Sequence, residues 1–128
     1  MLDACDLWEE IGRDRIEAYV CNLSPYLKKR IKQKFGDTST LFSPDIPEFT
    51  SGLTSFNPFR DINDGKKIEA FVDRLKKEMG YVIRFTEFDL HKRDPKPTFA
   101  LRISTHLFHD QNQVDGVVDA MHRLWKTM

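Results

Sequence analysis

The sequence predicts an α/β (α+β) two-layer sandwich: a small, mostly antiparallel sheet of three to four strands with helices on one face, beside a long N-terminal helix. Apolar residues recur at spacings of three and four before residue 36, between residues 64 and 79, and after residue 110, which indicates amphipathic helices. Short runs rich in β-branched and aromatic residues separate them. The order α-(α)-β-β-α-β-β-α lets each helix bury one stripe against the sheet.

Composition limits the possible classes of protein. A chain of 128 residues with 40% apolar residues is long enough for one folded domain. Its formal net charge of zero argues against a nucleic-acid module held by phosphate attraction, and no apolar run has the roughly 20 residues of a membrane span. The two cysteines form no Cys-x-x-Cys pair, and the acidic start Met1–Asp6 is not a secretory signal. We therefore expect a cytoplasmic protein.

Residues 1–36 are expected to form an N-terminal helical segment, which joins residues 37–128 in one structural unit. Gly12 separates a short first helix from a longer one, and Gly36 ends the longer helix. Pro25 lacks an amide hydrogen, so it either kinks the helix or restarts it with Ser24 as the cap. The apolar stripe continues across Pro25, which favours the kink. That stripe comprises Ile16, Tyr19, Val20, Leu23, Tyr26, Leu27, Ile31 and Phe35.

The middle of the chain predicts two strands and a helix. Residues 38–43 read as a short strand and residues 49–57 as a second one, with Gly52 inside it at a bulge. The following helix begins at a cap supplied by Asn63 or Asp64 and ends before Gly80.

The last third predicts two more strands and a helix. Residues 81–88 form the third strand, a charged loop follows, and residues 98–104 form the fourth strand with strict alternation. The last helix starts at Asp110, and Gln113 three residues later completes a variant of the capping box.

Arg102 is the first candidate for a functional residue, because it lies in the middle of a strand on the face opposite three apolar side chains. A guanidinium in that position needs water, an acid or a ligand, and its planar fork matches a carboxylate. Periodicity alone favours a salt bridge to a neighbouring acid. Arg84 lies on the same face if the third and fourth strands are neighbours, and the pair would then attract an anion; a solvated arginine is the simpler interpretation.

His106, His109 and Asp110 form a His-x-x-His-Asp motif, in which histidines three apart are able to chelate zinc on one helical turn. Here they precede a helix, Asp110 is needed as its cap, and no third ligand is evident. We therefore expect no metal. His91 and Lys92 lie in a strongly polar loop, so a solvated pair is expected rather than a catalytic one.

Three segments carry a resemblance to a known family: Leu7–Ile16, Phe49–Phe56 and Leu101–Asp115. The last has an Arg-x-Ser strand, an aromatic residue, a cap and a helix with an acidic residue near Asp115. Together they resemble the C-terminal small domain of class V aminotransferase-like enzymes, which use pyridoxal 5'-phosphate in fold type I. Ser104, Thr105 and His106 are most similar to the isopenicillin N epimerase-like branch, within a group that includes cysteine desulfurases and selenocysteine lyases.

The resemblance implies a fragment that lacks the large domain with the cofactor and its Schiff-base lysine, so no cofactor-binding residue is assigned in this chain. Residues 1–36 would lead from that domain. The counterpart of Arg102 anchors the α-carboxylate of the amino-acid substrate, and Arg84, His106 and His109 are further candidates for substrate contact. The full-length family is typically homodimeric. His109 and Asp110 depart from the usual Asn and Thr. The alternative is a stand-alone module, without catalysis, that binds a small carboxylate or another protein.

Overall fold

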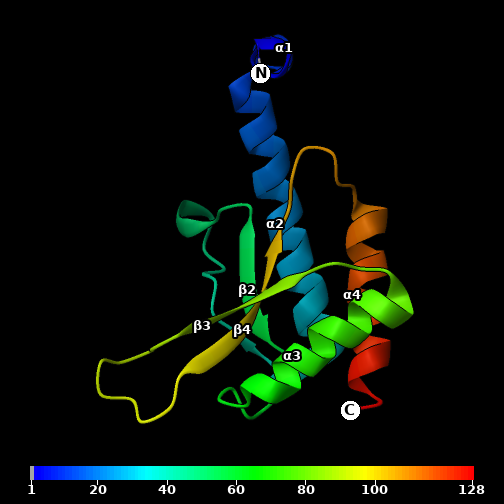
Figure 1. Cartoon of the computed structure of the whole chain (residues 1–128). Coiled ribbons are helices and arrows are strands. Elements are labelled where there is room, and N and C mark those ends of the chain that lie inside the picture. The colour runs from blue at the N-terminus through cyan, green and yellow to red at the C-terminus, as the bar shows by residue number, and fades with distance from the viewer. Residues whose placement is uncertain (1) are drawn as a thin grey trace.

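The computed structural model describes residues 2–128, which form a four-stranded antiparallel sheet with helices packed against one face (Figure 1). The strand order is β1-β2-β4-β3, so the two-layer α+β fold expected from the sequence is confirmed. The elements in chain order are α1 (Leu2–Ile11), α2 (Arg13–Phe35), β1 (Thr40–Leu41), β2 (Leu53–Asn57), α3 (Gly65–Arg74), β3 (Arg84–Phe88), β4 (Thr98–Ser104) and α4 (Gln111–Trp125).

The N-terminal helices follow the predicted breaks. Gly12 separates α1 from α2 with a φ of 92°, and Gly36 ends α2 with a φ of 56°, values in the left-handed region that suit glycine. The helix α2 runs through Pro25 without interruption, so the alternative of a restart at Ser24 is wrong. In Figure 1 the N-terminal half of α2 extends beyond the sheet and carries α1 at its end.

The first two strands are shorter than predicted. Of residues 38–43 only Thr40 and Leu41 pair, and β2 begins at Leu53 rather than Phe49, which lies in a 3₁₀ turn. The predicted bulge at Gly52 is wrong. This glycine precedes β2, and a Cβ there would lie 2.6 Å from Cγ1 of Val20. A glycine is therefore needed because α2 passes close to the start of β2.

Both predicted helix caps after residue 60 are confirmed. The Asp64 side chain accepts a hydrogen bond from the Lys67 amide, and Asp110 and Gln113 form a complete capping box at α4. The α-helical part of α3 ends at Arg74 and continues as a π-helical turn, Leu75–Met79, up to Gly80. The strand β4 has the predicted bounds, whereas β3 starts three residues later than expected.

The hydrophobic core lies between the helices and the inner face of the sheet, and α2 contributes to it along its C-terminal half. Phe56 and Leu101 are cross-strand partners and both are fully buried. None of the helices in residues 2–128 combines the length and the apolar character needed to cross a lipid bilayer. The buried core residues are Leu23, Leu27, Ile31, Phe35, Phe56, Phe59, Ile68, Phe71, Leu75, Leu101, Ile103, Val114, Val118, Ala120, Met121 and Leu124.

The outer face of the sheet carries no helix. Phe42 and Phe88 come from opposite edges of the sheet and meet edge to face, with ring centroids 5.2 Å apart. They cover one end of this face, where Ala100 and Thr98 are buried. The other end of the face, around Arg102, is left open to solvent.

Candidate functional site

The late start of β3 opens a cleft at one end of the sheet. Pairing between β3 and β4 begins at Arg84 and Arg102, so Ile103 and Ser104 of β4 have no β3 partner. The segment before β3 is drawn away toward α4, where the Tyr81 hydroxyl lies over Gly116. A Cβ on Gly116 would come within 2.5 Å of that hydroxyl oxygen. The missing side chain of Gly116 thus allows the sheet to open.

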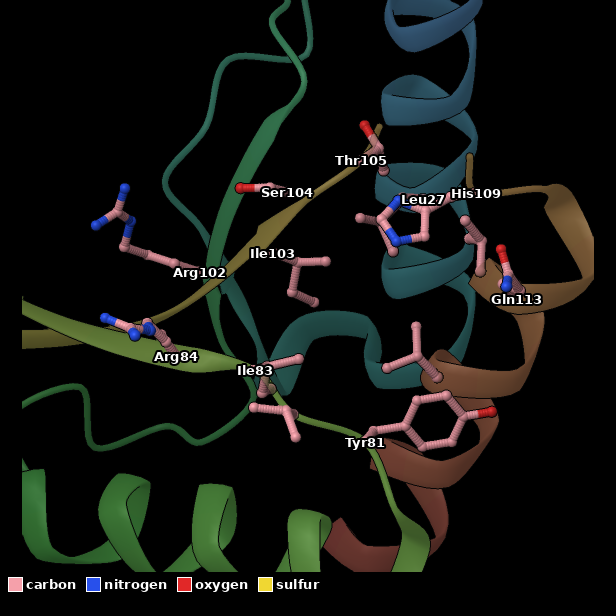
Figure 2. Close-up of a pocket in the computed structure, with 13 residues that line it drawn as sticks. Leu27, Tyr81, Ile83, Arg84, Arg102, Ile103, Ser104, Thr105, His109 and Gln113 are labelled. Atoms are coloured by element: carbon pink, nitrogen blue, oxygen red, sulfur yellow. The ribbon is translucent and has the colours of Figure 1, made fainter. Parts of the chain in front are cut away.

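The cleft has a volume of about 620 Å³ and joins an apolar floor to a polar rim. Figure 2 shows the side chains of His109 and Gln113 on the α4 side, whereas the guanidinium groups of Arg84 and Arg102 extend from the strands in the opposite direction. A site that encloses apolar surface and offers a few polar groups suits a small amphipathic molecule. The floor consists of Leu27, Ile83, Ile103, Val114 and Val117, with Tyr81 and Val82 at its outer end.

Arg84 and Arg102 are directly opposite each other on neighbouring strands, and Ser55 of β2 continues the same row. Directly opposed residues of an antiparallel pair have Cβ atoms roughly 5 Å apart, so the two side chains share the outer face. Both arginines are exposed, and neither lies within 4.0 Å of an acidic side chain in the described part of the chain. The salt bridge that periodicity favoured for Arg102 does not form.

The two candidate histidines have different surroundings. His109 lines the cleft, its Nδ1 accepts the amide hydrogen of His106 at 2.9 Å, and its carbonyl oxygen accepts the Tyr19 hydroxyl. His106 stacks on Phe108 at a centroid distance of 4.5 Å and meets the edge of Trp8. The structure therefore brings Arg84, Arg102 and His109 to one cleft and turns His106 toward α1.

Asp110 and the His91–Lys92 pair do not line this cleft. Asp110 is engaged as the α4 cap, and within residues 2–128 no three His, Cys, Asp or Glu side chains gather closely enough to hold a metal ion. His91 and Lys92 are exposed in the loop between β3 and β4 and do not line the cleft.

A second hollow, of about 430 Å³, lies on the outer face and also includes Arg102. Lys28 of α2 lines it although only 1% of this residue is exposed. Its Nζ donates to the Pro44 carbonyl oxygen at 2.7 Å, and no carboxylate lies within 4.0 Å of it among the described residues. Burial lowers the pKa of Lys28 because a charged ammonium is disfavoured away from water.

Sequence reasoning missed Lys28, Tyr81 and Gly116. The sequence contains a pattern that marks two of these residues, Lys28 and Gly116. Lys28 lies three residues before Ile31 on the apolar stripe of α2, and Gly116 is a glycine inside an otherwise regular helix. No pattern marks Tyr81, because its partner is distant in the sequence.

The chain matches no protein-family model, and a search of curated proteins found none with significant similarity. The resemblance to class V aminotransferase-like enzymes stays a prediction that depends on the three segments quoted above.

Proposed function

We propose that this chain is the C-terminal small domain of a pyridoxal-phosphate-dependent, class V aminotransferase-like enzyme, and that Arg102 binds the α-carboxylate of its amino-acid substrate. One observation supports the proposal: Arg102 lies at the edge of an apolar cleft, and its exposed guanidinium lies on the outer face of the sheet beside Arg84, without an acidic partner among residues 2–128. An unpaired guanidinium fork is suited to bidentate binding of a carboxylate.

The role of this chain is to bind and orient. A carboxylate held by both arms of a guanidinium has a fixed direction, so the bound molecule is oriented relative to the outer face of the sheet. His109 lines the α4 side of the cleft, on the opposite side from the two guanidinium groups. His106 does not line this cleft and contacts Trp8 and Phe108 instead.

The residues of this chain do not fit a complete pyridoxal-phosphate site. Of the residues that the structure describes, no lysine lines the cleft beside α4, and the lysine of the outer hollow, Lys28, already donates to the Pro44 carbonyl oxygen. In the proposal the cofactor belongs to a large domain, which would be the chain's main partner in a homodimeric, cytoplasmic enzyme.

Exposed aromatic side chains near α2 support the proposal that this chain packs on another domain. Trp8 and Tyr19 contact His106 and His109 in the loop between β4 and α4, and Phe108 of the same loop is 70% exposed. Large exposed apolar side chains that gather in one place are typical of an interaction surface. The same observation also favours the second candidate function, a module without catalysis that binds another protein.

Carboxylate binding by Arg102 is tested by NMR titration of the 128-residue chain with butyrate. Replacing Arg102 with Gln is expected to weaken binding by a factor of about 10 to 100, since a hydrogen bond to a charged group contributes roughly 1.5–3 kcal/mol. Arg93→Gln, in the exposed loop, removes the same charge elsewhere and is the matched control. Equal butyrate affinity in the Arg102→Gln and Arg93→Gln variants would disprove the proposal.

The cofactor assignment is tested by absorbance. Pyridoxal phosphate added to the chain is expected to give no aldimine band beyond that of exposed surface lysines, and Lys28→Met is expected to leave the spectrum unchanged. A band that disappears in Lys28→Met would show that this chain holds a cofactor lysine of its own.

A further inference from the structure

The charge at the cleft rim exceeds what one carboxylate can neutralise. Arg84 and Arg102 place two positive charges in direct cross-strand register, and like charges in that arrangement repel each other. A monocarboxylate on Arg102 carries a single negative charge. It would leave the Arg84 guanidinium without a counter-charge.

Among residues 2–128, no acidic side chain supplies this counter-charge on the outer face. The outer-face positions of β2, β3 and β4 near the pair hold Ser55, Ser104, Thr86 and Leu53, and none is acidic. Glu87, the nearest acid along β3, is three residues from Arg84 and alternates to the opposite face. The second negative charge must therefore come from the bound molecule or from solvent ions.

The position of Arg84 favours a bound molecule. It is the first residue of β3, and Figure 2 shows its side chain extending to the same side as that of Arg102. Both guanidinium groups therefore lie on the outer face of the sheet, whereas Ile83 and Ile103 point to the other side. The site thus has two neighbouring cationic contacts on one exposed face.

The geometry points to Arg84 as a specificity-determining residue: the site takes a short dicarboxylate, with one carboxylate on Arg102 and the second on Arg84. This inference rests on the proposed function and narrows the substrate to amino acids with an acidic side chain. Arg84 discriminates because a monocarboxylate of equal length leaves it unpaired, whereas a dicarboxylate pairs both arginines.

The test compares succinate with butyrate, which has the same number of carbon atoms and one carboxylate, by NMR titration of the 128-residue chain. Succinate is expected to bind about tenfold more tightly than butyrate, since one added charged hydrogen-bond pair is worth at least that factor. Arg84→Gln is expected to remove this preference and to leave the butyrate affinity unchanged. Arg102→Gln is expected to weaken both ligands, and Arg93→Gln to weaken neither.

The outcomes separate the two proposals. If Arg102→Gln changes neither affinity, the proposed function fails. If Arg102→Gln weakens both ligands but Arg84→Gln leaves the succinate preference intact, the proposed function stands and the dicarboxylate inference is overturned. Inorganic phosphate is the third ligand. Phosphate binding as tight as that of succinate, and lost in both variants, would show a general dianion site and would likewise overturn the inference.

Discussion

Two regions of the molecule treat positive charge in opposite ways. Along the contact between α2 and α4, Arg30 pairs with Asp115 at 2.8 Å and Lys34 pairs with Asp119 at 2.9 Å. On the outer face of the sheet, Arg84 and Arg102 have no acidic partner within residues 2–128, and Lys28 has only a carbonyl oxygen.

The difference separates structural charges from candidate functional ones. Arg30 and Lys34 are each neutralised by an aspartate from a distant part of the chain, so their charges contribute to the contact between two elements. Arg84, Arg102 and Lys28 have no carboxylate partner of that kind among the described residues. We therefore expect substitutions in the two regions to change the free energy of unfolding in opposite directions.

The largest effect is expected from Asp115→Ala. The Asp115 carboxylate accepts the Tyr26 hydroxyl at 2.8 Å and the Arg30 Nε–H at 2.8 Å, and this variant leaves both donors without their partner. The free energy of unfolding should fall by about 1–3 kcal/mol in urea denaturation. Asp73→Ala, at an exposed position of α3, should change it by less than about 0.5 kcal/mol. An equal loss of unfolding free energy in Asp115→Ala and Asp73→Ala would contradict a structural role for the Arg30–Asp115 ion pair.

Lys28→Met is expected to stabilise the fold by roughly 1 kcal/mol near neutral pH, because it removes a buried ammonium that has no carboxylate partner. Lys29→Met, at the next and exposed position of α2, should have little effect.

The pH dependence of Lys28 has a definite sign. Burial lowers its pKa in the folded protein, so the unfolded chain binds more protons between that pKa and the ordinary value of about 10.4. The stability of the original protein should therefore rise with pH in that window. The free energy of unfolding of Lys28→Met should rise less with pH over the same window. If it has the same pH dependence in both proteins, the lowered pKa of Lys28 is not the cause.

Arg84→Glu is expected to raise the free energy of unfolding by about 0.2–1 kcal/mol at low ionic strength. The variant replaces a repelling cross-strand pair with an attracting one. Added salt should shrink the gain, because it screens exposed charges. The same variant should lose carboxylate binding, since the new glutamate side chain would form an ion pair with Arg102. A loss of stability would show that the two guanidinium groups do not repel each other.

The smallest effect is expected at acid pH from Asp119. Lys34 lowers the pKa of this carboxyl group, so the ion pair adds stability above the ordinary pKa and loses it as the pH falls through the lowered value. Because Asp119 is partly exposed, the contribution should be below about 1 kcal/mol. Asp119→Asn should flatten the acid limb of the stability curve, and Asp73→Asn should leave it unchanged.

Local signals in the sequence were sufficient for the helices and for β4. Glycines at positions 12, 36 and 80 mark real helix boundaries, and the Asp110 cap follows from a spacing of three residues. The strict alternation of Thr98–Ser104 gave both the bounds of β4 and the outward direction of Arg102.

The errors occurred where distant residues determine the local structure. Residues 81–83 have strand-like composition, but Tyr81 packs against Gly116 of α4 and draws them off the sheet. Residues 49–52 look extended, but the approach of Val20 fixes Gly52 before the strand begins. The juxtaposition of Arg84 and Arg102 was conditional on strand order, which no single strand encodes.

Pro25 has a consequence for how the long helix opens. A proline nitrogen carries no hydrogen, so the Cys21 carbonyl oxygen lacks the donor that a regular helix would supply at this position. This missing hydrogen bond lies between two halves of α2. One half extends past the sheet, and the other holds Leu27, Ile31 and Phe35 in the core. Amide hydrogens before residue 25 should therefore exchange with deuterium as one group, well ahead of those after it. The helix would fray inward from α1 and stop at the proline.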